Sequence, residues 1–220
     1  MKNDASAPVI EVKNLTCGYG ETVVLQDVSF AVHARELLFV IGGSGCGKST
    51  LLRCLIGLLK PFQGDVVYFG KSFIAADPTQ RREILKTFGV LYQNNALWSS
   101  MTLAENISLP LWYHSKRDIE ETEKSVEYWL TMLAIDPAVC SDFMASPPHG
   151  VEPWQRKLAG LLRALVQMPR ILVVDAGLFE DVKTRIAQVW IAALENYASQ
   201  DRAVLVLADK ATVLPWQKIE

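Results

Sequence analysis

The chain has 220 residues, a formal net charge of −2 and a 50% share of hydrophobic residues, which suits one α/β domain or one domain with an inserted lobe. Charged residues break every apolar run before the ~18 positions that a membrane-spanning helix needs, which argues against a spanning segment. The near-neutral charge without Lys/Arg blocks argues against nucleic acid as a partner.

The first third of the chain predicts strands around a glycine loop. Residues 9–15 and 23–32 are rich in β-branched side chains and are joined across GYGE, which favours a hairpin or adjacent strands. The run ELLFVIGG (36–43) predicts a buried strand that ends in glycine. Apolar residues then follow a helical period until Pro61, at Leu51, Leu52, Leu55, Ile56 and Leu59.

The middle third indicates an insertion of helices. Residues 65–69 and 88–92 predict strands, and 78–86 predict a helix. From 101 to 145 the pattern becomes helical, because SKRDIEETEKSVEYWLTMLAI (115–135) separates charged from apolar side chains at helical spacing. We therefore expect a helical lobe inserted into the sheet domain.

The last third returns to alternating helices and strands. Residues 153–168 and 182–198 predict helices, and RILVVD (170–175) and AVLVLA (203–208) predict strands. This alternation predicts an α/β fold.

IGGSGCGKST (41–50) carries the strongest functional signal. Gly42, Gly47, Lys48 and Ser49 match the phosphate-loop pattern in full, between a predicted strand and a predicted helix, so a chance glycine-rich turn is disfavoured. Backbone N–H groups would cradle a triphosphate, Lys48 would reach the outer phosphates, and the Ser49 hydroxyl would face Mg²⁺. The expected phosphate-binding set is Gly42, Gly43, Ser44, Gly45, Cys46, Gly47, Lys48, Ser49 and Thr50.

The order of further residues narrows the class of nucleotide-binding protein. Tyr19 precedes the loop, Gln93 follows the strand GVLYQ, and the helical segment lies between Gln93 and the strand that ends in Asp175. Over nearly the whole chain this order resembles the ATP-binding-cassette (ABC) ATPase family. The resemblance implies ATP and Mg²⁺ as cofactors, Tyr19 stacked on adenine, Gln93 in the glutamine loop, and Ser49, Gln93 and Asp175 at the metal; an isolated tyrosine at a turn more often only packs.

YQNNALWSSMTLAENISLPLWYHS (92–115) carries a finer likeness. It is similar to the ATPases of Mla-type lipid transporters, which work with permeases and lipid-binding MCE proteins, and it shares features with methionine importers. Asn106, Leu109 and Pro110 carry most of this likeness. The same stretch also fits an amphipathic helix with Thr102 as N-cap and Glu105 completing a capping box.

The family's signature motif is missing. Gapless spacing back from Pro169 places VEPWQ (151–155) on the signature, with Glu152 in the serine's place and Pro153 and Trp154 in the glycines'. A carboxylate facing phosphate at ~4 Å is repelled by about 1 kcal/mol in water and ~4 at an effective dielectric of 20. As plain structure, Glu152 suits a helix cap, Pro153 a first turn, and Trp154 packing, and this interpretation is favoured.

The hydrolytic residues that the resemblance implies are replaced as well. Ala176 stands where the family has a glutamate, and alanine cannot accept a proton from water. Val182 replaces an aspartate, while Ala208 and Asp209 stand in place of Ser/Thr and the switch histidine. A register slip of one or two residues is the alternative. His33, His114 and His149 are expected at the surface or in loops.

The resemblance implies a mixed sheet with a P-loop core and an antiparallel N-terminal β edge, with a core lobe at about 1–92 and 154–220 and a helical lobe at about 94–153. A groove near Gln93, enriched by Trp98, Trp112 and Tyr113, would receive a permease helix. Partners would be that permease and a second ABC ATPase, identical or not. The expected location is the cytoplasmic face of the inner membrane.

Several smaller expectations accompany this assignment. Cys17, Cys46, Cys54 and Cys140 form no Cys-x-x-Cys pair, and the start MKNDASAPVI resembles no secretory signal, which together indicate reduced cytosolic thiols. The three histidines are not spaced for zinc. Family members normally continue beyond the position of Glu220 with a further strand and helix.

Two functions of different classes follow. The first is a subunit that binds ATP–Mg²⁺ without hydrolysing it and acts structurally or as a regulator in a transporter. The second is a working ATPase that depends on a competent partner subunit or retains a reduced rate. A small-molecule kinase is weakly supported, because no acceptor site or lid arginine cluster is identifiable.

Overall fold

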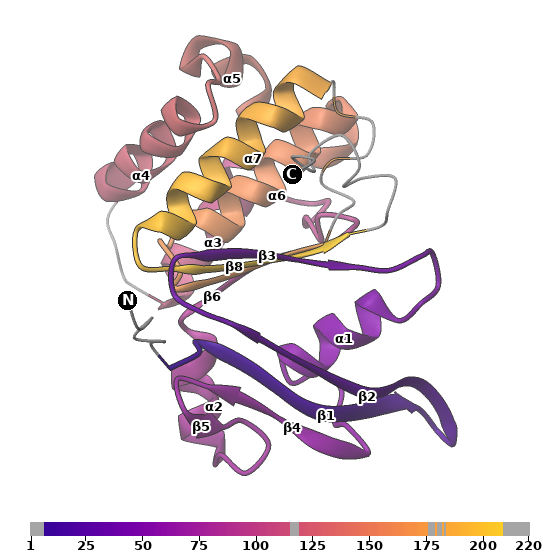
Figure 1. Ribbon diagram of the computed structural model, residues 1–220. Helices are drawn as coiled ribbons and strands as arrows, with labels where there is room; N and C mark the ends of the chain where they lie inside the picture. The colour runs from indigo at the N-terminus through magenta and orange to yellow at the C-terminus, as the bar shows by residue number, and fades with distance from the viewer. Residues whose placement is uncertain (1–6, 115–118, 176–178, 180–181, 183, 209–220) are drawn as a thin grey trace.

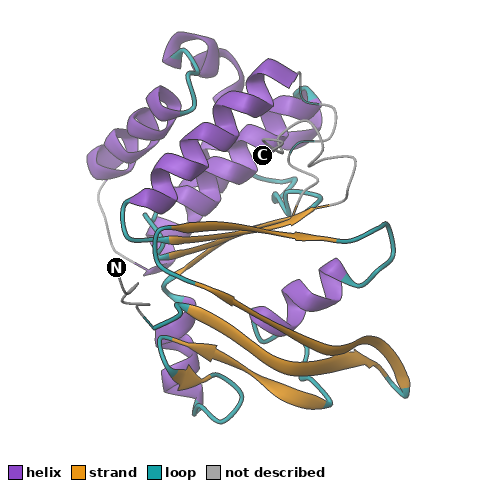
Figure 2. Ribbon diagram, in the orientation of Figure 1, coloured by secondary structure: helices purple, strands orange, loops and turns teal. Residues whose placement is uncertain are grey.

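The computed structural model describes residues 7–114, 119–175, 179, 182 and 184–208. Two four-stranded sheets lie one above the other, with one helix between them and a layer of helices over the outer face of the second sheet (Figures 1 and 2). The predicted α/β architecture with antiparallel N-terminal strands and a helical insertion is confirmed.

The first sheet is antiparallel and has the order β2 (Thr22–Val32), β1 (Ile10–Tyr19), β4 (Gln63–Tyr68), β5 (Lys71–Ser72). β1 extends beyond the expected end at residue 15, because its pairing with β2 continues through register shifts to Tyr19 opposite Thr22. Only two residues are left for the hairpin turn, and Gly20 supplies the positive φ that such a turn needs. Tyr19 is therefore the last strand residue and does not lie in the turn.

The second sheet is parallel throughout and has the order β3 (Glu36–Ile41), β8 (Ala203–Ala208), β7 (Ile171–Asp175), β6 (Phe88–Leu91). Every residue of β7 and β8 is buried, as expected for strands covered on both faces. The expectation of one mixed sheet was wrong: β1 and β2 pair with each other and with β4, and β3 pairs with β8.

Helix α1 (Lys48–Leu55) fills the space between the two sheets (Figure 1). Its buried leucines pack in one cluster with β1 and with Val173, Leu205 and Leu207 of the parallel sheet. The alternate residues of β7 and β8 face the opposite cluster, as strand geometry requires. Helix α2 (Pro78–Leu85) lies on the same face of the parallel sheet as α1, because its buried Ile84 packs in the same cluster. The Asp77 side chain caps its N-terminus.

The upper helical layer consists of α3 (Leu103–His114), α4 (Ile119–Met132), α5 (Pro137–Met144), α6 (Pro153–Leu165) and α7 (Thr184–Ser199), with a short 3₁₀ turn at Pro148–Gly150. The segment expected to be helical from 101 to 145 is thus three helices. They share one buried cluster with α6, α7 and the parallel sheet. The lobe boundaries at 94 and 153 therefore stay a prediction.

Two polar contacts tie α4 to the end of α6. The Trp129 indole Nε1 donates to the Leu165 carbonyl at 3.1 Å, and the Ser125 hydroxyl donates to the Val166 carbonyl at 2.9 Å. Both bonds are buried, where an unpaired polar group is costly, so they fix the docking of α4. Among the described residues, no helix has the length and apolar character needed to cross a membrane.

We expect Leu205→Ala to lower the free energy of unfolding by about 2–5 kcal/mol, because it leaves a cavity under a fully buried central strand. Urea denaturation measures the loss. The matched control is Leu58→Ala, the same change at a 69% exposed side chain, which should cost less than about 0.5 kcal/mol. Equal losses in the two variants would contradict the packing described for β8.

Candidate nucleotide-binding site

The phosphate loop connects the end of β3 to the start of α1. Gly47 is the residue before the helix and has φ 100°, a conformation that L side chains rarely adopt. A Cβ added there would lie 2.7 Å from the Leu25 Cδ2 atom of β2. Leu25 of the first sheet thus lies directly against the loop. Only glycine can adopt this φ and fit the space that Leu25 leaves.

Lys48 points back into the loop that precedes it. Its ammonium donates to the Gly42 carbonyl at 2.7 Å and to the Gly43 carbonyl at 2.8 Å. Residues 43 to 46 and Ser49 are exposed, whereas Thr50 is buried against the core. A positive charge therefore sits inside an accessible ring of backbone at a helix N-terminus, which is the arrangement that phosphate requires.

Strand register brings Asp175 to the same edge as this loop. The Gly42 amide donates to the Ala208 carbonyl at 3.0 Å, and β8 also pairs with β7, with Leu207 opposite Asp175. Asp175 is 6% exposed at the carboxyl end of its strand. In parallel α/β sheets, ligands bind outside the carboxyl ends of the strands, so loop and carboxylate share one candidate site.

Gln93 reaches this edge from the other side of β7. β6 pairs with β7, with Leu91 opposite Val174, and the exposed Gln93 follows two residues later. Ser49, Gln93 and Asp175 offer hydroxyl, amide and carboxylate oxygens, the donors that Mg²⁺ prefers. They fit an ion held jointly with phosphates and waters; the described residues contain no metal-binding group of three His, Cys, Asp or Glu.

Tyr19 lies apart from these residues, beside α1. Its hydroxyl accepts a 2.6 Å hydrogen bond from the Arg53 guanidinium, whose central carbon lies 5.8 Å from the ring centroid. The ring is 44% exposed. Arg53 is a partner that the sequence did not reveal, since the two are 34 positions apart.

The turn that follows Gln93 is held in an unfavourable backbone conformation. Asn95 and Ala96 both have positive φ, at 60° and 47°. Arg163 of α6 donates to the carbonyls of both residues. Burial lowers the pKa of Arg163 and raises that of the neighbouring Tyr92. The sequence did not reveal this contact, because Arg163 lies 67 and 68 positions from its two acceptors.

Asn106 anchors the remainder of the same loop. Its side chain accepts from the Trp98 amide at 2.7 Å and donates to carbonyls at Trp98, Met101 and Thr102. Asn106 is fully buried, so this amide is a structural clamp. The predicted capping box is confirmed, because Thr102 and Glu105 exchange hydrogen bonds.

The start of α6 carries the residues that the sequence register predicts in place of the signature motif. Glu152 is the N-cap and Pro153 occupies the first turn. The Trp154 Nε1 atom donates to the Glu152 carboxylate at 2.7 Å, and its ring packs edge-on against Phe143 at 5.7 Å. The predicted cap, first-turn and packing positions of Glu152, Pro153 and Trp154 are confirmed. The carboxylate belongs to a local cap on an exposed helix end.

The four cysteines differ in exposure and in position. Burial, followed by contact with Cys17, raises the pKa of the Cys54 thiol on α1, and burial also raises that of Cys17. Cys46, in the loop itself, is exposed. Burial and then the Asp136 charge raise the pKa of Cys140 to about 11. The three buried thiols are thus held protonated at neutral pH.

The structure describes only two of the four residues predicted to stand in place of hydrolytic ones, Val182 and Ala208. Ala176 and Asp209 lie outside the described residues. Val182 is partly buried against the helical cluster, and Ala208 is fully buried at the end of β8. Of the histidines, His149 is exposed in the 3₁₀ turn.

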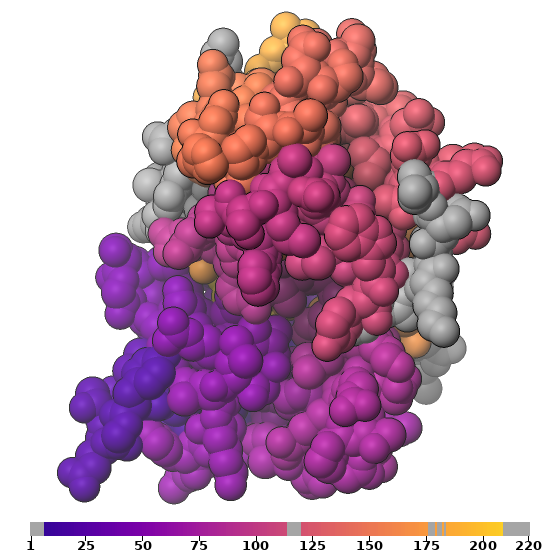
Figure 3. Space-filling view, turned by 180° about the vertical axis from the view of Figure 1, so that it is seen from behind, coloured from indigo at the N-terminus to yellow at the C-terminus, as the bar shows by residue number. Residues whose placement is uncertain are grey.

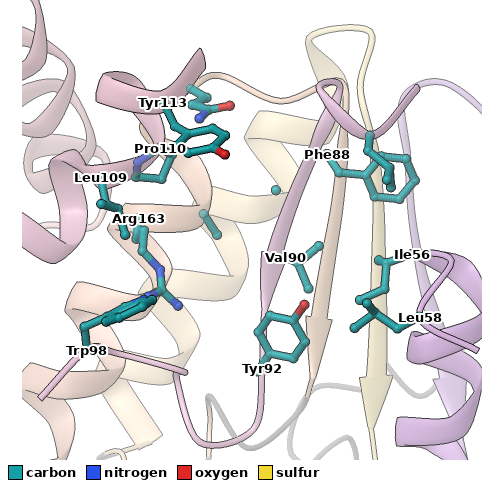
Figure 4. Close-up of a pocket in the computed structure, with 14 residues that line it drawn as sticks. Ile56, Leu58, Phe88, Val90, Tyr92, Trp98, Leu109, Pro110, Tyr113 and Arg163 are labelled. Carbon is teal, nitrogen blue, oxygen red and sulfur yellow. The ribbon is translucent and has the colours of Figure 1, made fainter. Parts of the chain in front are cut away.

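An apolar groove of about 580 Å³ runs beside the site, on the back of the molecule, where the surface is hollowed between the helical region and the first sheet (Figure 3). Leu109, Pro110 and Tyr113 form one wall, and Ile56 and Leu58 lie across from them (Figure 4). Trp98 and Arg163 lie at one end of the wall, and Tyr92, next to Gln93, lies on the floor.

The groove expected near Gln93 is therefore present. Trp98 and Tyr113 line it as anticipated. Trp112 was expected there too and does not line it; it faces a second groove between α3 and α4.

Comparisons with known proteins agree on one family. The family model described as "ABC transporter" matches residues 25–177. The probable ribonucleotide transport ATP-binding protein mkl of Mycobacterium leprae is 37% identical over 166 residues, which is 76% of this chain and 46% of that protein. The methionine import ATP-binding protein MetN of Brucella abortus is 34% identical over 77% of this chain and 44% of that protein.

The chain thus spans less than half the length of these curated relatives. Among solved structures, a dimeric ATP-binding cassette in a post-hydrolysis state with ADP and Pi matches with a TM-score of 0.79 at 24% identity, over 91% of this chain and 88% of that one. A bacterial Atm1-family ABC exporter with ATP bound matches with a TM-score of 0.76 at 20% identity, over 97% of this chain and 37% of that one. The fold is that of an ABC cassette, as the resemblance implied.

We expect Gly47→Ala to weaken binding of a fluorescent ATP analogue by at least about 10-fold, because the new methyl would meet Leu25 at a backbone angle that alanine resists. Gly150→Ala is the matched control and should bind like the parent, since it lies outside the phosphate loop, a Cβ there would meet no atom closer than 3.8 Å and φ is not positive. Titration by fluorescence anisotropy measures both. Unchanged affinity in the Gly47 variant would contradict the assigned loop geometry.

Proposed function

This chain belongs to the ABC transporter family, and we propose that it is a nucleotide-binding subunit that holds ATP–Mg²⁺ but hydrolyses it at no more than a background rate. One observation carries the proposal. The complete phosphate loop and Asp175 share one sheet edge, whereas the residues that would activate water and close a second nucleotide site are replaced.

Binding is assigned to residues that the fold brings to this edge. Loop amides and the Lys48 ammonium would neutralise the phosphates, and Ser49, Gln93 and Asp175 would hold Mg²⁺, which would offset phosphate charge. Tyr19 would stack on the base; its ring is half-exposed and is held beside α1 by Arg53. These roles are proposals supported by position and donor chemistry.

The proposed loss of hydrolysis rests on two replaced side chains. Alanine at 176 removes a general base, a change that typically costs about 10²–10⁴-fold in rate. Aspartate at 209 stands where the family has its switch histidine. The intact loop without these groups favours holding nucleotide over cleaving it.

In a pair of ABC ATPases, each nucleotide site is formed by the phosphate loop of one subunit and the signature segment of the other, so changes in one chain affect both sites. In the family's usual pairing, the α6 N-terminus of one subunit would cover the nucleotide held by the other. Here that end already carries the Glu152 carboxylate, bound to Trp154, and a proline that lacks an N–H donor. A partner's phosphate would meet negative charge at this end, so we propose that this half of the pair is impaired too.

A working ATPase is the alternative. It is supported by the intact phosphate loop and by relatives whose names describe transport ATP-binding proteins. A competent partner would restore closure over this chain's nucleotide but would not supply its missing base.

We further propose that the subunit acts at the cytoplasmic face of the inner membrane, with the groove of Figure 4 receiving an apolar permease segment. Leu58 and Trp98 lie there with 69% and 61% of their surfaces exposed, and together with the apolar lining they form one contiguous surface that a partner could cover. A lipid cargo is proposed from the likeness of residues 92–115 alone. The named relatives point to ribonucleotide and methionine transport instead.

For the isolated chain we expect saturable ATP binding that Lys48→Ala abolishes, together with phosphate release at background. Isothermal titration and a malachite-green assay measure the two properties. We also expect Ala176→Glu alone to restore no turnover, because the switch histidine and signature would still be absent. Turnover at ordinary transporter rates that depends on Lys48 would overturn the proposal.

Leu58→Glu should abolish co-purification of the chain with its membrane partner, because a carboxylate would be desolvated in an apolar groove. Val139→Glu is the matched control, at a 49% exposed position on α5 outside the groove, and should leave co-purification unchanged. Quantitative mass spectrometry of the captured membrane fraction provides the readout. Equal capture by both variants would place the permease contact elsewhere.

A further inference from the structure

We propose that a second groove, between α3, α4 and α5, binds a basic amphipathic helix of a partner protein. This groove, named here the acidic groove, has a volume of about 410 Å³. Its rim carries Glu105 of α3 and Glu123 and Glu127 of α4. Ile107, Val126 and Met144 form its apolar part.

The charges of the acidic groove are of one sign. Among the described residues that line it, none is Lys, Arg or His. Glu123 and Glu127 are one helical turn apart, and like charges at that spacing destabilise a helix. Within the described part of the chain neither forms an ion pair, whereas Lys124 on the same helix binds Glu120 at 2.6 Å. A basic partner would relieve this repulsion.

Glu105 adds a fixed negative charge on the opposite wall. Hydrogen bonds from the Thr102 backbone and hydroxyl lower the pKa of its carboxyl, so it is ionised at neutral pH. Those bonds also hold the side chain at the first turn of α3. The two walls thus present carboxylates on both sides of the groove.

Between these walls the groove is apolar. Ile107 is fully buried at its base, and Trp112 is 51% exposed beside it. An exposed indole next to carboxylates favours a Lys or Arg side chain, whose cation can lie over the ring. An apolar floor between acidic rims matches an amphipathic helix with leucine-like residues on one face and basic residues flanking them.

The acidic groove is separate from the proposed permease groove. Ser108 and Trp112 of α3 face the acidic groove, whereas Leu109 and Tyr113 face the other. At 3.6 residues per turn these pairs lie on different sides of the helix. Both surfaces can therefore be occupied at once, and the inference does not rest on nucleotide binding.

The probe for the test is a labelled peptide of about 18 residues, five helical turns, built from leucine, alanine and lysine with the lysines flanking the leucine face. We expect saturable binding to the full chain by fluorescence anisotropy, weakened by added salt. The Glu123→Gln/Glu127→Gln double variant should weaken binding at least about 10-fold, and Trp112→Ala should weaken it as well. The matched control, Glu21→Gln/Glu195→Gln, removes the same charge at exposed positions elsewhere and should bind like the parent.

Thermal unfolding by circular dichroism confirms that each variant is folded before binding is compared. Absence of binding to the parent chain would overturn the proposal. So would equal binding by the two double variants, or equal binding of a peptide with glutamate at each lysine position. Dodecyltrimethylammonium below its micelle concentration serves as a competitor that resembles a small cationic ligand. If it displaces the labelled peptide at a lower concentration than unlabelled peptide does, the groove binds a small cation and the proposal of a protein partner is wrong.

Discussion

The register of three parallel strands positions the phosphate loop relative to Asp175. β8 pairs on one side with β3, where the Gly42 amide donates to Ala208, and on the other with β7, where Leu207 lies opposite Asp175. A slip of one strand by one residue would move each of its side chains to the other face and exchange the residues that pack in the two apolar clusters. The two apolar clusters therefore fix the position of the phosphate loop relative to the carboxylate.

Helix α6 connects this edge to the rest of the helical layer. Its N-terminus is closed by its own Glu152 and Trp154, its middle is buried, and Arg163 near its end holds the strained turn behind Gln93. A displacement of α6 would therefore move both the proposed dimer face at its N-terminus and the turn that follows Gln93.

Helix α3 gives the protein two different surfaces. One side contributes Leu109 and Tyr113 to an apolar groove beside the nucleotide edge, and the other contributes Glu105 and Trp112 to the acidic groove. If both proposed contacts form, α3 would contact two partners at once. The buried Asn106 clamp keeps α3 fixed against the loop between these surfaces.

The sequence by itself determined the motif chemistry and most element positions, because the phosphate loop, the apolar runs of β7 and β8 and the Thr102 capping box are encoded in local spacing. It also determined that residues 176 and 209 are alanine and aspartate. Only the tertiary structure decided that β1 and β2 join β4 and β5 in a sheet separate from the parallel one, that Arg53 holds Tyr19, that Arg163 holds the turn after Gln93, and that Trp112 lines a different groove from the one beside Gln93. These features depend on strand pairing and on contacts between residues far apart in the chain, and local periodicity carries no information about such distant partners.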